Sequence, residues 1–181
     1  MREYILEIKK ILSSQDCKKI ISYFDRDYID AGTLGKGINK NVRNCITTSL
    51  RPQSFGETIV YNYVRSKIFT IFEKYKERNS YADIQRISQL DLLKYESNSF
   101  DAGYKFHVDF GDKVTERAFS ISICLNNNFS GGEFVFDLPE GQIQIPQNEG
   151  DAIIFPSNFM FPHQVNKVTK GTRYALIGWV V

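Results

Sequence analysis

Residues 92–109 read LLKYESNSFDAGYKFHVD and contain two short apolar runs separated by a polar segment. Residues 90–95 and 104–108 have the length, and the aromatic and branched side chains, that are typical of β-strands. The Ser, Asn, Asp and Gly residues between the two runs are typical of a turn. The sequence therefore predicts two consecutive strands, and a His-x-Asp pair stands at the end of the second.

The same pattern continues to the C-terminus. Short apolar or alternating runs recur from residue 87 onward, and Gly, Asn, Asp and Pro separate them. About seven or eight short strands with such punctuation favour a barrel or a double-sheet jelly roll. We predict an α+β, mainly β fold with a double-stranded β-helix (jelly roll, cupin-like) core. The predicted strands are residues 90–95, 104–108, 119–125, 133–136, 142–145, 152–155 and 174–181.

The N-terminal part predicts a strand and two helices that buttress this core. Residues 4–8 alternate apolar and polar side chains, as a half-buried strand does. Residues 13–16, SSQD, offer helix N-cap chemistry, and an apolar stripe follows at helical spacing. A second stripe runs from Val60 to Tyr75. We expect a single domain over 1–181, with N-terminal strands and helices in 1–86 and the jelly-roll core with the metal site in 87–181.

Composition limits the function classes. The chain has 181 residues, enough to bury a core without disulfide or metal staples. Its 23 basic and 21 acidic residues give a charge of +2, which provides no electrostatic reason to expect a nucleic-acid or membrane partner. Cys17, Cys45 and Cys124 show no C-x-x-C pairing, which argues against a disulfide framework or a zinc site. The N-terminus lacks the apolar stretch of a signal peptide, and no later segment could span a bilayer, so we expect a cytoplasmic protein.

The two histidines of the chain, His107 and His163, suggest a metal site together with Asp109. Residues two apart on a strand point to the same side, so His107 and Asp109 could chelate one ion. Two imidazoles and one carboxylate on one face of Fe(II) leave the adjacent positions open, as non-haem oxygenases require. An isolated His-x-Asp is more often a surface His and a turn Asp, and these ligand types also leave manganese, cobalt and zinc open.

Arg173 lies ten residues after His163 in an apolar C-terminal run. Its planar guanidinium could hold a carboxylate through two parallel hydrogen bonds. The alternative is an ordinary strand arginine that reaches solvent.

Residues 92–109 and the run GDAIIFPSNFMFPHQVNKVTKGTRYALIGW at 150–179 resemble the prolyl 4-hydroxylase-like branch of the Fe(II)/2-oxoglutarate-dependent dioxygenase superfamily. Between them, CLNNNFSGGEFVF at 124–136 is similar to the family's Leu-Asn turn, Gly-Gly-Glu and following strand. Looser similarities at 11–21 and 41–50 extend the resemblance over nearly the whole chain. Its most specific parts are the His-x-Asp pair and the H-x-V…G-T-R-Y-A block.

This resemblance implies a function. It implies Fe(II) bound by His107, Asp109 and His163, and 2-oxoglutarate as cosubstrate with its distal carboxylate on Arg173. The implied enzyme is a prolyl 4-hydroxylase that acts on proline in a peptide or protein. It would use O2, convert 2-oxoglutarate to succinate and CO2, and need ascorbate as reductant. We expect a monomer or homodimer.

Several aromatic residues are further candidates. The resemblance suggests that the hydroxyl of Tyr95 lies near the cosubstrate, although a core tyrosine fits the sequence equally well. Tyr104 belongs to the same pattern. Trp179 should share a strand face with Arg173, because the offset is even, and it either lines the substrate cleft or belongs to the core.

The chain departs from the family at Cys124, where many proline-hydroxylating relatives have a tyrosine that helps to hold the cosubstrate. Either another hydroxyl, such as that of Tyr95 or Ser122, replaces it, or the cosubstrate pocket differs. Residues 31–41, AGTLGKGINKN, carry three glycines and predict a mobile loop. The resemblance implies that this loop closes over the substrate as a lid.

Three alternative functions differ from a prolyl hydroxylase. Nucleic-acid dealkylating oxygenases share the iron ligands but typically have a second arginine six residues after the first, where this chain has Trp179. An oxygenase of the same fold that hydroxylates another small molecule or residue remains open. The non-enzyme alternative is a metal-binding, cupin-like sensor domain without catalysis, and turnover of 2-oxoglutarate would separate it from the enzymes.

Overall fold

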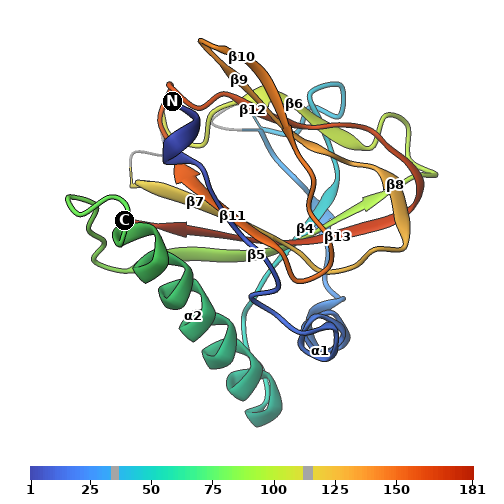
Figure 1. The fold of residues 1–181 in the computed structure, drawn as a ribbon. Coiled ribbons are helices and arrows are strands. Elements are labelled where there is room, and N and C mark those ends of the chain that lie inside the picture. Colours follow the sequence, from blue (N-terminus) through green and yellow to red (C-terminus); the bar gives the residue numbers. More distant parts are fainter. Residues whose placement is uncertain (34–36, 112–115) are drawn as a thin grey trace.

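The computed structural model describes residues 1–33, 37–111 and 116–181. Within these ranges the chain forms two antiparallel sheets and two α-helices (Figure 1). The helical segments are η1 (Arg2–Tyr4), α1 (Ser14–Phe24) and α2 (Phe55–Lys76). The strands are β1 (Leu6–Ile8), β2 (Ile29–Asp30), β3 (Arg43–Asn44), β4 (Ile46–Ser49), β5 (Ile87–Glu96), β6 (Gly103–His107), β7 (Phe119–Cys124), β8 (Phe129–Gly131), β9 (Phe134–Leu138), β10 (Gly141–Ile145), β11 (Ala152–Pro156), β12 (His163–Val165) and β13 (Val168–Val180).

The two sheets face each other as in a jelly roll. The larger sheet has the order β1-β11-β7-β13-β5-β4-β2, with β8 attached to β13, and the smaller sheet has the order β10-β9-β12-β6-β3. All the strand pairs are antiparallel. This architecture confirms the predicted fold class.

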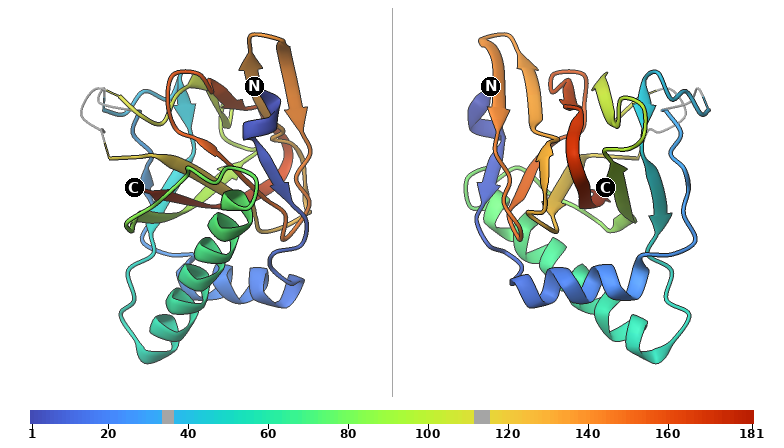
Figure 2. Two further views of the ribbon diagram at one scale, coloured as in Figure 1. Left: turned by 60° about the vertical axis from the view of Figure 1, so that its left-hand side comes forward. Right: turned by 90° about the vertical axis from the view of Figure 1, so that its right-hand side faces the viewer.

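The core is divided into two layers by the larger sheet. Successive residues of β5 point to opposite sides, so Leu92 packs with the helices and Leu93 packs between the sheets. Figures 1 and 2 show both α-helices on the outer face of the larger sheet, away from the smaller sheet. The helices therefore cover the outer face of the larger sheet, and the space between the two sheets is free of helices.

The helices form for reasons visible in the sequence. The Ser13 hydroxyl accepts a hydrogen bond from the Asp16 amide, and the Asp16 carboxylate accepts one from the Ser13 amide, which makes a capping box at the start of α1. Ser54 caps α2 through its hydroxyl, which accepts a hydrogen bond from the Glu57 amide, and the stripe that includes Val60 and Tyr75 is buried against the sheet. No helix in the described ranges has the length and apolar composition needed to cross a membrane.

Candidate active site

The structure brings together the three predicted metal ligands. His107 ends β6, His163 begins β12, and the two are direct partners in the antiparallel pair. Asp109 lies just beyond the end of β6, where its amide donates to the carbonyl of Ser157 at 3.2 Å. One ligand atom from each of His107, Asp109 and His163 lies within 4.8 Å of the other two. Such a cluster can hold a single ion.

Both imidazoles are oriented with Nε2 toward this cluster. His107 Nδ1 lies 2.8 Å from the carbonyl oxygen of Lys105, and His163 Nδ1 lies 3.0 Å from that of Phe161. Because a carbonyl can only accept, each Nδ1 carries the proton, and the Nε2 lone pair is left for a metal. Burial lowers the pKa of both histidines, that of His107 to about 3, so both are neutral as metal ligands must be.

Asp109 is held by two donors. Its Oδ2 accepts a hydrogen bond from Ser120 Oγ at 2.6 Å and another from Trp179 Nε1 at 3.0 Å. Burial opposes ionisation of this carboxyl, but the adjacent imidazoles and these hydrogen bonds hold its pKa below the ordinary range. Ser157 donates in turn to Ser120, at 2.8 Å. The carboxylate is therefore ionised and fixed in orientation.

A β-bulge places Tyr104 beside His107. His163 pairs with His107 and Val165 pairs with Tyr104, so three steps along β6 match two along β12. In a regular strand, residues three apart point to opposite sides. The bulge turns both rings to the same side, where they stack with centroids 3.3 Å apart and an interplanar angle of 15°.

A cavity of about 230 Å³ adjoins the metal ligands. His107, Asp109 and His163 form part of its wall, so the open side of the cluster is accessible from it. The predicted site residues Tyr95, Tyr104 and Trp179 also line it. The remaining lining residues are Gly32, the apolar side chains of Leu93, Ile121, Phe134, Phe155, Val165 and Ile177, and the polar ones of Thr33, Arg43, Arg117, Ser120 and Ser122.

Arg173 lies behind the wall of this cavity. It is only 2% exposed, and its guanidinium carbon lies 5.5 Å from the centroid of the Tyr95 ring. Its Nη2 donates to Gln147 Oε1 at 3.2 Å, and no carboxylate among the described residues forms an ion pair with it. A buried cation without an anion is costly. The position therefore suits a carboxylate brought by a ligand.

Sequence reasoning missed several residues of the site. Ser120 and Gln147 touch Asp109 and Arg173, and nothing in their local sequence marks them. Arg43 stacks over Tyr104 with its guanidinium carbon 4.7 Å from the ring centroid. Its Nη1 donates to the Gly32 carbonyl at 2.8 Å, and its buried Nε has no partner among the described residues. The GGE similarity could have indicated the close approach of the Gly132 backbone to Arg173.

The predicted lid, residues 31–41, lies partly outside the described residues, which omit 34–36. Thr33 and Gly37 on either side pair through their backbones, with Thr33 N donating to Gly37 O at 2.7 Å. Thr33 lines the cavity, so the described part of this loop reaches the site.

The donor set fits Fe(II). Two neutral imidazole nitrogens and one ionised carboxylate converge from one side, and the cavity supplies space on the other side for further ligands. A family model described as the 2OG-Fe(II) oxygenase superfamily matches residues 90–181, half of the chain, which include all three ligands and Arg173. The chain belongs to the 2OG-Fe(II) oxygenase superfamily and is an oxidoreductase.

Within this superfamily the chain is prolyl hydroxylase-like. It is 23% identical over 180 residues to a PKHD-type hydroxylase of Idiomarina loihiensis, covering 97% of this chain and 77% of the relative. It is 25% identical over 187 residues to a PKHD-type hydroxylase of Rippkaea orientalis, covering 97% and 78%.

Solved structures share the fold. A Trichoplax adhaerens prolyl hydroxylase, in complex with a peptide fragment of the hypoxia inducible factor oxygen degradation domain, matches with a TM-score of 0.83 at 17% identity, covering 98% of this chain and 83% of that one. A Pseudomonas putida prolyl-4-hydroxylase matches with a TM-score of 0.77 at 15% identity, covering 98% and 91%.

Proposed function

We propose that this protein is an Fe(II)- and 2-oxoglutarate-dependent hydroxylase that acts on proline in a peptide or protein. Hydroxylation would be coupled to conversion of 2-oxoglutarate to succinate and CO2. One observation carries the proposal: the His107–Asp109–His163 cluster adjoins a cavity whose wall, at Tyr95, lies against the buried Arg173, which has no anionic partner among the described residues. A ligand that chelates the metal at one end and carries a carboxylate at the other would bind both the His107–Asp109–His163 cluster and Arg173.

The residues divide the work between them. His107, Asp109 and His163 would hold Fe(II), which supplies, when bound, the activation of O2 that hydroxylation of an unreactive C–H bond requires. Arg173, together with the Tyr95 that packs beside it, would bind and orient 2-oxoglutarate. The apolar walls of the cavity exclude water around the reacting groups. Ascorbate would keep the iron reduced.

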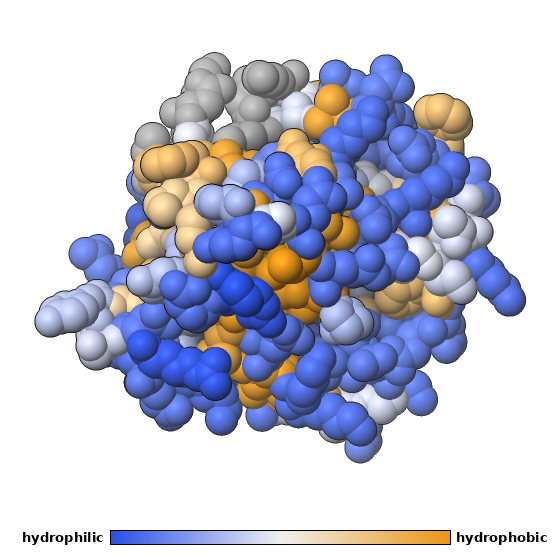
Figure 3. Space-filling model, turned by 45° about the horizontal axis from the view of Figure 1, so that its top comes forward, coloured by the Kyte–Doolittle hydropathy of each residue, from blue (hydrophilic) through white to orange (hydrophobic). Residues whose placement is uncertain are grey.

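The surface next to Asp109 supports a polypeptide substrate. Phe110, Phe159 and Met160 are 40%, 78% and 44% exposed, although large apolar side chains are usually covered. Their two segments are tied together by the Phe110 amide, which donates to the Ser157 carbonyl at 3.0 Å. Figure 3 shows apolar side chains at the upper left of this face, and further apolar side chains near its centre among largely hydrophilic surroundings. Such a patch beside the metal ligands suits an extended peptide with apolar residues near its proline.

A second candidate substrate is a small acidic molecule. Arg43 and Arg117 both line the cavity, and Arg43 Nε lacks a partner among the described residues. An anionic group close to the oxidised carbon would satisfy these cations. In that case the same oxygenase chemistry would act on a free acid.

Succinate formation tests these alternatives. The protein is incubated with Fe(II), ascorbate, O2 and 2-oxoglutarate, with and without a proline-rich peptide, and mass spectrometry follows the peptide. We expect peptide-stimulated succinate and one added oxygen atom on the peptide, both lost in Arg173→Ala and His107→Ala. Succinate that small acids stimulate and the peptide does not would support the second candidate. An absence of succinate with metal bound would overturn the oxygenase proposal.

A further inference from the structure

Cys124 does not offer a hydrogen-bond donor to a ligand. Its thiol donates to the carbonyl of Asn126, with Sγ 3.3 Å from the oxygen. Burial raises the pKa of this thiol, so it remains neutral, and a neutral thiol is a weak donor. A carboxylate bound at Arg173 would therefore take any hydroxyl donor from elsewhere in the wall.

Ser122 has such a donor. It stands two residues before Cys124 on β7, so its side chain points to the same side of the strand, and it lines the cavity. It is 2% exposed, and its Oγ has no hydrogen-bond partner among the described residues. A buried hydroxyl without a partner is unfavourable. Its orientation into the cavity indicates that a ligand supplies the missing acceptor.

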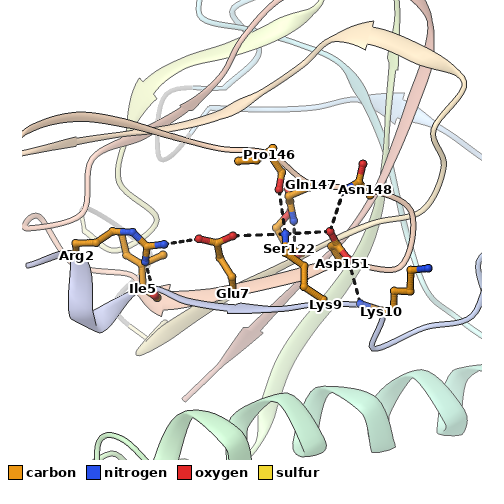
Figure 4. Close-up of polar contacts among 10 residues, drawn as sticks. All are labelled: Arg2, Ile5, Glu7, Lys9, Lys10, Ser122, Pro146, Gln147, Asn148 and Asp151. Carbon is orange, nitrogen blue, oxygen red and sulfur yellow. Dashed lines mark hydrogen bonds and ion pairs between the residues drawn. The ribbon is translucent and has the colours of Figure 1, made fainter.

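Gln147 connects Ser122 with Arg173. Its Nε2 donates to the backbone carbonyl of Ser122 at 3.1 Å, and its Oε1 accepts from Arg173 Nη2 at 3.2 Å. Figure 4 shows the Gln147 side chain extending to Ser122. One amide therefore contacts both the backbone of Ser122 and the guanidinium of Arg173, so these two residues lie on either side of Gln147.

The turn that carries Gln147 is anchored by Asp151. The carboxylate of Asp151 accepts hydrogen bonds from the Lys10 amide at 3.0 Å, the Asn148 amide at 3.1 Å and Lys9 Nζ at 3.1 Å. Figure 4 shows these contacts joining the segment after β1 to the turn between β10 and β11. Gln147 is thus presented by a fixed backbone, and its contact with Arg173 restrains the guanidinium.

We propose that Ser122 donates its hydroxyl to the distal carboxylate of 2-oxoglutarate beside Arg173, and that Gln147 positions the Arg173 guanidinium. This inference rests on the proposed function, because it assumes that 2-oxoglutarate is the ligand. A carboxylate oxygen accepts from the guanidinium and from the hydroxyl at once, which satisfies both buried groups. Ser122 would thereby supply the hydroxyl group that many proline-hydroxylating relatives supply from a tyrosine at the position of Cys124.

Calorimetric titration of the Mn(II)-loaded protein separates the two ends of the cosubstrate. 2-Oxoglutarate has the distal carboxylate, and pyruvate keeps only the 2-oxo acid end. We expect Ser122→Ala to weaken 2-oxoglutarate binding about ten- to a hundredfold, as loss of a hydrogen bond to a charged group does, and to leave pyruvate binding unchanged. Ser122→Thr keeps the hydroxyl and should restore much of the affinity. Ser130→Ala, on the exposed part of β8, is the control.

Gln147→Glu tests the positioning role in the same titration. The new carboxylate would lie against Arg173 and compete there with the ligand. We therefore expect a larger loss of 2-oxoglutarate affinity than in Gln147→Ala, and no change in the affinity for pyruvate. If Ser122→Ala does not fold, Ser122→Cys conserves the volume while weakening the donor.

Wild-type affinity for 2-oxoglutarate in Ser122→Ala, or equal losses for 2-oxoglutarate and pyruvate in that variant, would overturn the inference. Failure of the wild type itself to bind 2-oxoglutarate would overturn the proposed function as well.

Discussion

Trp179 and Ser120 determine how Asp109 faces a metal. Both donate to Oδ2, so this oxygen is occupied, while Oδ1 has no hydrogen-bond partner among the described residues. Oδ1 lies 3.6 Å from His107 Nε2 and Oδ2 lies 3.7 Å from His163 Nε2, so both oxygens face the cluster. A fixed carboxylate loses little freedom when it binds an ion, and partners of this kind contribute to metal affinity.

We predict that Ser120→Ala lowers metal affinity about ten- to a hundredfold, because Asp109 loses its shortest hydrogen bond. Trp179 is the single tryptophan of the chain and touches the ligand Asp109, so its fluorescence can follow a Mn(II) titration. Ser122→Ala is a matched control, since it lies on the same strand and the same side without a contact to Asp109. Equal metal affinities in the two variants would contradict this role of Ser120.

Gly132 explains the second glycine of the GGE sequence. Its φ is +70°, and a Cβ at this position would lie 2.8 Å from Arg173 Cδ and 3.0 Å from Val168 Cγ2. A side chain is therefore unfavourable for two reasons, the left-handed backbone and the space that Arg173 occupies.

We predict that Gly132→Ala displaces Arg173 and weakens 2-oxoglutarate binding severalfold or more, besides costing roughly 1–3 kcal/mol of stability through backbone strain. Calorimetry and thermal unfolding measure the two effects. Gly141→Ala is the control, because Gly141 also has a positive φ, of +116°, but nothing lies within 4 Å of its Cβ position. Gly141→Ala should reduce the stability without changing the affinity for 2-oxoglutarate. Unchanged 2-oxoglutarate affinity in Gly132→Ala would contradict the prediction.

At the scale of elements, the first helix and the second are joined by an ion pair. Arg26, just after α1, donates from Nη1 and Nη2 to the two carboxylate oxygens of Glu57 at 2.7 and 3.0 Å. Glu57 lies in the first turn of α2, where a negative charge is favourable. The hydrogen bond from Arg26 is the main cause that lowers the pKa of Glu57 from 4.5 to about 2.

This shift predicts how stability depends on pH. A carboxylate with a lowered pKa in the folded state stabilises the fold at any pH above its unfolded value, 4.5, and that stabilisation is lost as the pH falls toward 2. We expect the melting temperature of Glu57→Gln to be lower than wild type at neutral pH and to depend less on pH between about 5 and 3. Glu73→Gln, at an exposed position of the same helix, should show the same dependence of melting temperature on pH as the wild type. The prediction would be contradicted if the melting temperature of Glu57→Gln also changed with pH as that of the wild type does.

The elements also show what the sequence could predict. α1 and α2 were predictable because their caps and apolar stripes are local, and the longer strands such as β5 and β13 have clear apolar patterns. The short strands β2, β8 and β12 were not predicted, because two or three residues carry too little pattern and form through partners distant in sequence. The bulge in β6 was equally hidden, since it depends on pairing with β12.

At the scale of the whole molecule, the site joins the two sheets. His107 and His163 belong to the smaller sheet, whereas Ser120 and Trp179 reach Asp109 from the larger one. The residue types and their resemblance to a family were enough to select the metal ligands and Arg173 as candidates, and their roles stay predictions. The supports, Ser120 and Gln147, became visible only when the sheets were brought face to face.

Metal-dependent binding of 2-oxoglutarate tests the central claim most directly. The titration is done by calorimetry without O2, on protein with and without Fe(II), for the wild type and His163→Ala. If the three ligands hold a metal that chelates the cosubstrate beside Arg173, one equivalent of 2-oxoglutarate binds tightly to the Fe(II)-loaded wild type. Binding is then far weaker without metal and in His163→Ala. Equal affinity with and without Fe(II), or no binding to the loaded protein, would contradict the account.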